Sequence, residues 1–128
     1  MLSRKKCLSP EDYKKEVLNV SLIDFAEYVL DDDIYYMTEE LLLNKIKSLL
    51  KDMIFDIKKF MFSFHLGFII ILRLYYELEN LNYIETNLIL DEKKYKIKKE
   101  YFSDIVNYIF CFFKQFVDES KNYKYSRR

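Results

Sequence analysis

The scarcity of glycine and proline constrains this chain more than any other feature of its sequence. Gly67 and Pro10 are the single examples of each in 128 residues. Tight turns, barrels and phosphate-binding loops depend on these two residue types, because glycine reaches positive φ and proline fixes φ. Hydrophobic residues make up 51% of the chain, which is too many for a disordered protein. We therefore predict an all-α fold.

The length predicts one helical domain over residues 1–128, since domains commonly contain about 100–150 residues. We expect the two ends, residues 1–8 and 121–128, to be frayed. Lys and Arg total 21, as do Asp and Glu, so the net charge is zero. A neutral chain lacks the strong field that draws a protein to nucleic acid, and we do not expect nucleic acid as a partner.

The counts of reactive residues argue against metal and cofactor sites. The chain has one His and two Cys, and none of them stands at a metal-ligand spacing. A single glycine cannot supply a dinucleotide fingerprint or a phosphate-binding loop. We predict no cofactor and no metal. Cys7 and Cys111 are expected to be free thiols, as in a reducing compartment.

The most apolar stretch, Phe60–Leu72, has the hydrophobicity of a membrane span but not its length. Its 13 residues fall short of the roughly 20 that cross a bilayer. We predict a buried core helix and no transmembrane segment, with shallow membrane association as the alternative. The basic residues near Met1 are followed by charged residues, unlike a secretory signal. The expected location is therefore cytoplasmic, or host cytoplasm for a viral protein, with the nucleus as the other reducing compartment.

Capping residues and apolar spacing predict where the N-terminal helices begin. Ser9 precedes Pro10 and two acids, which is typical of a helix start, and Ser21 resembles a second one that Asp31–Asp33 would end. Thr38 opens a third helix, whose apolar side chains recur every three or four residues. A single helix from Thr38 to Leu81 would be about four times the usual length. We expect a break near 54–63, with Ser63 as the cap.

The second half of the chain contains the two most apolar helical stretches. Phe64–Leu78 is apolar around most of its circumference, which is typical of the central helix of a bundle. A last helix, rich in aromatic residues, follows Lys98. Between them, apolar residues alternate around 83–97, and this pattern fits either a short hairpin near 87–97 or an extended loop.

Two groupings of residues resemble catalytic pairs, and in both cases we favour a structural reading. His65 and Cys111 would need an exposed thiolate beside the imidazole. Cys111 stands between two phenylalanines, so we expect it to be buried and inert. The carboxylate pairs Glu77/Glu79 and Asp31/Asp33 are expected on a solvent face. We predict that the protein is not an enzyme.

Two surface features remain as candidates for binding. Five lysines lie within 93–99, flanked by acids, and we favour a solvated loop over a phosphate contact. The 11 Phe and 12 Tyr exceed what one central helix and its neighbours need, so some should reach the surface and contact proteins. Core filling in a sequence biased towards Ile, Lys, Phe and Tyr is the alternative. The aromatic candidates for the surface are Tyr28, Tyr35, Tyr36, Tyr75, Tyr76, Tyr108, Phe112 and Tyr123.

The order of these elements resembles a known family. SLIDFAEYVLDDD is followed by TEELLLNKIKSLLKDMI, then by the very apolar FHLGFIIILRLYYELE and by YFSDIVNYIFCFF. This order is similar to the B-cell lymphoma 2-like fold, and within it to the short poxvirus immune-evasion proteins that lack a membrane anchor. The resemblance covers roughly residues 20–119. It implies a central hydrophobic hairpin wrapped by amphipathic helices.

One position of the resemblance departs from the family. Gly67 resembles the glycine that opens the central helix beside the peptide groove, but Phe68 stands where death-motif binders carry an arginine. An arginine makes a bidentate contact with a peptide carboxylate, and Arg73 lies nearly two turns further on. The resemblance therefore implies inhibition of innate immune signalling through surface contacts, often by a dimer, rather than capture of a death-motif peptide.

These observations predict a non-enzymatic intracellular interaction module that binds a host protein through a helical face and forms a homodimer. The alternative is a small helical adaptor, or cyclin-box-like subunit, of a larger assembly. We also expect Gly67→Leu to disturb packing around the central helix. The predicted partner-binding residues are Tyr28, Tyr36, His65, Gly67, Phe68 and Arg73.

Overall fold

Side chains that cap backbone N–H groups define the first elements of the fold. The computed structural model describes residues 9–21, 28–91 and 93–126. Helix α1 (Pro10–Asn19) is capped by Ser9, and α3 (Glu39–Leu49) by Thr38, so both predicted starts are confirmed. The second predicted helix falls largely on residues 22–27, outside the described residues. Asp31 does not end a helix: its side chain accepts a hydrogen bond from the N–H of Asp33 and begins the short 3-10 helix η2 (Asp32–Tyr36).

The predicted break after α3 is present, and it contains a strand. Strand β1 (Ile54–Asp56) leads into α4 (Ile57–Phe64), and α5 (Phe68–Asn80) follows. The cap is Asp56, whose carboxylate accepts from the Lys59 N–H at 3.2 Å, whereas Ser63 lies within α4. The predicted helix Phe64–Leu78 is therefore wrong at its start. His65 takes a left-handed conformation (φ 53°) that ends α4, and α5 begins after Gly67.

A small antiparallel sheet corrects the all-α prediction. Of the two alternatives for residues 83–97, the structure has the hairpin, as β2 (Ile84–Asp91) and β3 (Lys94–Ile97), and β1 pairs with the other edge of β3. The protein is thus mostly helical, with a three-stranded sheet in the order β1-β3-β2. The three residues of β1 are too few to show an alternating pattern, and their partners lie some 40 residues further along the chain (Ile54 opposite Lys96).

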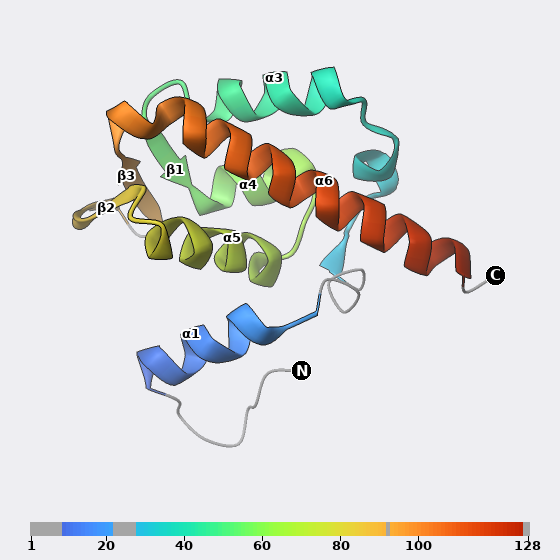
Figure 1. The fold of residues 1–128 in the computed structure, drawn as a ribbon, viewed down its shortest axis with the longest axis horizontal. Helices are drawn as coiled ribbons and strands as arrows, with labels where there is room; N and C mark the ends of the chain where they lie inside the picture. The colour runs from blue at the N-terminus through green and yellow to red at the C-terminus, as the bar shows by residue number, and fades with distance from the viewer. Residues whose placement is uncertain (1–8, 22–27, 92, 127–128) are drawn as a thin grey trace.

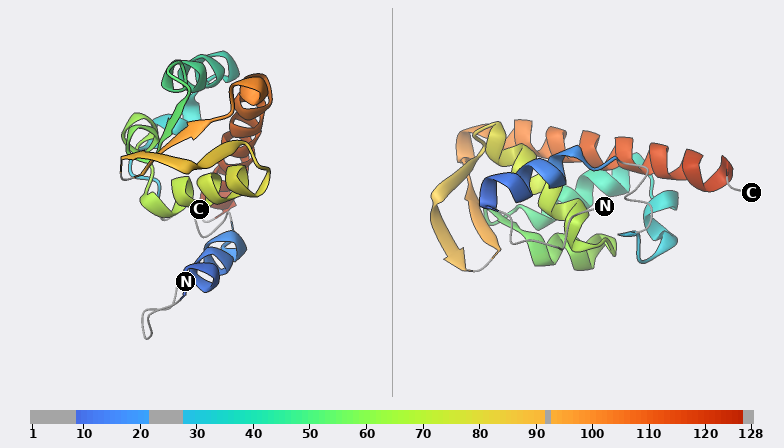
Figure 2. Two further views of the ribbon diagram at one scale, coloured as in Figure 1. Left: turned by 90° about the vertical axis from the view of Figure 1, so that its left-hand side faces the viewer. Right: turned by 90° about the horizontal axis from the view of Figure 1, so that it is seen from below.

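The last element, α6 (Phe102–Ser126), follows the 3-10 turn η3 (Lys99–Tyr101). It is helical through residues 121–126, which the sequence analysis expects to be frayed, while residues 1–8 are outside the described part. Figure 1 shows the sheet at one end of the helices and the C-terminal half of α6 extending beyond the other end. The left view of Figure 2 shows α1 outside the other helices, and its main contacts are with α5.

The core is built from aromatic side chains of β1, α4 and α6. The Phe55 and Phe60 ring centroids are 4.9 Å apart, and those of Phe64 and Phe113 are 4.7 Å apart. All four side chains are almost completely buried. Helix α5 contributes aliphatic side chains to the same cluster. Its fully buried positions include Ile70, Ile71, Leu74 and Leu78.

The opposite face of α5 is not enclosed by this core. Ile69, Arg73 and Tyr76 recur every three or four residues and are all half-buried. Helix α1 lies against α5, and its Lys14 and Val20 contact Tyr76 and Arg73. The prediction of a central helix therefore holds for one face of α5 only, since the other face is covered by a short, polar helix.

Candidate functional site

Two polar contacts hold α1 on α5 in an antiparallel arrangement. The Lys14 ammonium pairs with Glu79 near the C-terminal end of α5, and the Arg73 guanidinium donates to the Val20 carbonyl. Lys14 and Val20 are six residues apart, as are Arg73 and Glu79, so the spacing of the two contacts matches on both helices. Between them lies Val17, the one fully buried side chain of α1.

The Glu79 carboxylate uses both oxygens. Oε1 lies 2.8 Å from the Lys14 Nζ, and Oε2 accepts a hydrogen bond of 3.1 Å from the Tyr75 hydroxyl. The Lys14 ammonium also lies 5.6 Å from the centroid of the Tyr76 ring, within the range of a cation–π contact. Lys14 and Glu79 are each 27% exposed, so the pair is partly shielded from solvent. The Glu79 carboxylate and the face of the Tyr76 ring therefore form a binding site for one ammonium group.

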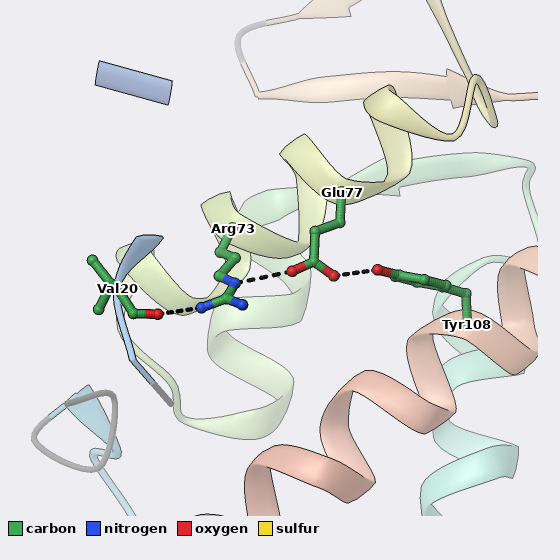
Figure 3. A network of polar contacts seen from close by, with 4 residues as sticks. All are labelled: Val20, Arg73, Glu77 and Tyr108. Atoms are coloured by element: carbon green, nitrogen blue, oxygen red, sulfur yellow. Dashed lines mark hydrogen bonds and ion pairs between the residues drawn. The ribbon is translucent and has the colours of Figure 1, made fainter. Parts of the chain in front are cut away.

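The Glu77 carboxylate is used in the same way. Its Oε2 accepts from the Arg73 Nε at 2.9 Å, and its Oε1 accepts from the Tyr108 hydroxyl of α6 (Figure 3). The Nη1 of Arg73 then donates to the carbonyl of Val20, the C-cap residue of α1. A cation at a helix C-terminus is favourable, because it complements the macrodipole and satisfies a carbonyl without an intrahelical partner. Tyr108 and Glu77 thus hold Arg73 where it meets the end of α1.

The supporting tyrosines are held in the neutral form. Burial, followed by the charge of Glu79, raises the pKa of Tyr75 well above its ordinary value. Burial and the hydrogen bond to Glu77 raise the pKa of Tyr108 likewise. A neutral hydroxyl remains a hydrogen-bond donor, so both tyrosines keep their carboxylates in place. These groups position the site and do not point to acid–base chemistry.

A second feature is a group of large apolar side chains that solvent reaches. Leu30 and Phe62 are each 72% exposed, and Tyr36 is 70% exposed. The Leu30 N–H donates to the His65 carbonyl, and Phe62 precedes His65 by one turn of α4. Segment 28–36, which includes Leu30 and Tyr36, lies at the end of the molecule away from the sheet (Figure 1). Leu41 is exposed near the start of α3, and Leu81 and Tyr101 are exposed at the sheet end.

The predicted partner-binding residues fall in three places. Tyr28, His65, Gly67 and Phe68 meet at the junction of α4 and α5, where the Gly67 N–H donates to the Tyr28 carbonyl at 2.8 Å. His65 is exposed, while Tyr28 and Phe68 are half-buried, with the Lys93 ammonium 5.4 Å from the Phe68 ring. Tyr36 is exposed on η2, and Arg73 lies under α1.

Several expectations for individual side chains are wrong. Cys111 is exposed, because it lies on the side of α6 away from the core. Its thiol makes no hydrogen bond with His65 in the described part of the chain. Glu77 and Glu79 are not on a solvent face, since α1 and Tyr108 cover them. The expectation that some of the aromatic candidates reach the surface is confirmed by Tyr36, which is exposed, whereas Tyr35, Tyr75 and Phe112 are buried and the side chain of Tyr123 is outside the described part.

Sequence analysis missed Lys14, Tyr75 and Tyr108 as partners of these carboxylates. The i, i+4 spacing of Arg73/Glu77 and Tyr75/Glu79 on one helix could have indicated that these side chains contact each other. Nothing in the sequence indicated that α1 and α6 would supply Lys14 and Tyr108.

The lysine-rich segment lies largely on β3 and is matched by acids. In the sheet, Lys94 stands opposite Asp56 on β1 and Asp91 on β2, and Lys96 stands opposite Glu85. Opposite charges on neighbouring strands stabilise a sheet and reduce the local field. The prediction of a solvated loop is therefore wrong for residues 94–97, which form strand β3.

Further comparisons do not identify the protein. Among the described residues, no helix is long and apolar enough to cross a membrane, and no group of three or more His, Cys, Asp or Glu could hold a metal ion. No protein-family model, curated protein or solved structure gave a significant match to this chain.

Proposed function

We propose that this protein is a non-enzymatic interaction module that acts in the cytoplasm, binds a host protein through a helical face and forms a homodimer. The observation that carries the proposal is the exposure of Leu30, Tyr36 and Phe62, each at least 70% accessible. Large apolar and aromatic side chains are enriched at protein interfaces. Their exposure agrees with the resemblance to anchorless viral inhibitors of innate immune signalling.

The polar site on α5 supports a binding role over a catalytic one. Both oxygens of Glu77 and both oxygens of Glu79 are occupied by cations and tyrosine hydroxyls of the same chain. Carboxylates engaged in this way, with a cation on one oxygen and a tyrosine hydroxyl on the other, hold helices together.

The proposal is tested by sedimentation velocity over a concentration series that reaches about 100 µM. We expect a dimer, and we expect Phe62→Ser to weaken it at least tenfold. The matched control is Leu81→Ser, at the sheet end, which should change dimerisation little. A second series adds fluorescent death-motif helical peptides. A dimer that ignores the peptides supports signalling inhibition, and a monomer that binds one supports apoptosis inhibition. A monomer that binds none contradicts the proposal.

A small helical adaptor subunit is the second candidate. It is favoured by the exposure of Leu81 at the end of α5 and of Tyr101 on η3, the two elements that flank the β2–β3 hairpin. Apolar residues at both ends would suit a subunit held between two neighbours. Such a subunit should be poorly soluble alone, and both Phe62→Ser and Leu81→Ser should improve its solubility.

A further inference from the structure

The α1 contact has the features of an exchangeable helix-binding site. Helix α1 has ten residues, fewer than the roughly 12–15 at which isolated helices become marginally stable in water. Val17 is its one fully buried side chain, with Tyr13 and Val20 partly buried against the core. The apolar burial that holds α1 is therefore small compared with that of α4 or α5.

The face beneath α1 supplies recognition at both ends of a helix. Glu79 and the Tyr76 ring take the Lys14 ammonium at one end, and Arg73 takes the Val20 carbonyl at the other. The Arg73 guanidinium donates to the main-chain carbonyl of Val20, so this contact does not depend on which side chain stands at position 20. The Glu79 contact requires only a cation. Neither contact is specific to the sequence of α1.

We propose that this face of α5 binds an amphipathic helix of another protein, and that α1 is its resident occupant until that helix displaces it. The proposal rests on the proposed function, because it names the kind of protein segment that the interaction module accepts. The partner helix carries a Lys or Arg, has apolar side chains three and six residues further on, and ends there. This is the pattern of Lys14, Val17 and Val20.

Displacement requires that the partner helix bind more tightly than α1 does. A tethered segment competes with an effective concentration of the order of mM. A partner with larger apolar side chains at the positions of Val17 and Val20 would bury more apolar surface than α1 does. A partner present at micromolar concentration must therefore bind about a thousandfold more tightly than α1 does, which about five additional buried methylenes supply.

The first experiment opens the site and supplies a helix from outside. The Val17→Asp substitution in the full chain places a charge at the one fully buried position of α1, so α1 should leave α5. The probe is a fluorescein-labelled, acetylated and amidated peptide of residues 9–21, followed by fluorescence anisotropy. We expect it to bind the Val17→Asp chain at least tenfold more tightly than the wild-type chain. Equal binding to both chains overturns the proposal.

A charge exchange tests the geometry. Glu79→Lys, added to the Val17→Asp chain, should weaken peptide binding at least tenfold, and a peptide with Lys14→Glu should restore it. The matched control is a peptide with Lys15→Glu, the same change at an exposed neighbour, which should bind the Val17→Asp chain as the unchanged peptide does. If the Lys15→Glu and Lys14→Glu peptides bind with equal affinity, Glu79 does not form a binding site for the ammonium group.

Two further outcomes keep the inference separate from the proposed function. If Val17→Asp loses its far-UV circular dichroism, Lys14→Glu replaces it as the opened chain, because that side chain lies outside the core. If no peptide binds while the association that depends on Phe62 persists, the helix-binding face is refuted and the interaction module stands. If the peptide binds but no association depends on Phe62, the interaction module is refuted and the helix-binding face stands.

Discussion

The contact between α4 and α6 and the contact between α1 and α5 are made by different kinds of interaction. The Phe60, Phe64 and Phe113 rings join α4 to α6 by direct aromatic packing. The contact of helix α1 with α5 includes one fully buried valine, the Lys14–Glu79 ion pair and the Arg73–Val20 hydrogen bond. Aromatic packing depends on the shape of every side chain involved, whereas the polar contacts need only a cation and a carbonyl. The first arrangement fixes a fold, and the second permits exchange.

The largest difference between the two contacts should appear when each loses a buried side chain. Phe60→Ala should lower the free energy of unfolding by about 3–5 kcal/mol, because it leaves a cavity in the aromatic cluster. Val17→Ala should cost far less and leave the global transition nearly unchanged. Urea unfolding followed by far-UV circular dichroism measures both. Similar losses for the two variants would contradict the distinction drawn here.

Gly67 tests the junction that separates α4 from α5. A Cβ at this position would lie 3.0 Å from the Tyr28 Cβ and 3.3 Å from the Tyr28 carbonyl oxygen. Gly67→Leu should therefore destabilise the protein by about 1–3 kcal/mol through overpacking against Tyr28. In a double-mutant cycle, Tyr28→Gly removes the Tyr28 Cβ, so its destabilisation and that of Gly67→Leu should not be additive in thermal unfolding. A single variant that melts within about 1 °C of wild type would show that the approach is not close.

Arg73 should matter to α1 more than to the rest of the molecule. Arg73→Met removes the hydrogen bonds to Val20 and Glu77 while keeping most of the side-chain volume. We expect the α1 amides to lose about 1–2 kcal/mol of protection in hydrogen exchange, with little change around Phe60 and Phe113. If hydrogen-exchange protection falls equally in α1 and around Phe60 and Phe113, Arg73 stabilises the whole fold and not α1 in particular.

Alkaline pH should act on the polar contact through Tyr75. Its raised pKa means that the folded state keeps the proton that the unfolded chain releases near pH 10. The stability from this group is present below pH 10 and is lost as the pH rises above it. Wild type should lose about 1 kcal/mol more than Tyr75→Phe between pH 9 and pH 11. Parallel pH profiles of the two proteins in urea unfolding would rule this out.

The smallest expected effect concerns His65, which adopts a left-handed conformation (φ 53°, ψ 49°) at the end of α4. His65→Gly should stabilise the protein by about 0.5–1 kcal/mol, because glycine reaches this conformation without steric cost. His65→Ala is the matched control and should not stabilise. If thermal unfolding shows alanine and glycine to be equivalent, the left-handed conformation carries no strain.

The sequence predicted local features better than distant ones. Ser9 and Thr38 were recognised as caps because their partners are three residues away, whereas the alternation near 87–97 did not distinguish a hairpin from an extended loop. The strand β1 was missed because its partners on β3 lie about 40 residues later and it is only three residues long. Glu77 and Glu79 were misassigned to solvent for the same reason: Lys14 and Tyr108 reach them from α1 and α6.

The long sequence separation within the α1 contact has a consequence for folding. Lys14 and Glu79 are 65 residues apart, and Val20 and Arg73 are 53 residues apart. Closing such long loops costs entropy before any contact is made. Because the contact is polar and its apolar burial is small, we expect α1 to dock after the aromatic cluster has formed and to detach first when the protein unfolds. The chain would then contain two cooperative units, and the smaller one opens at a rate set by Arg73 and Glu79.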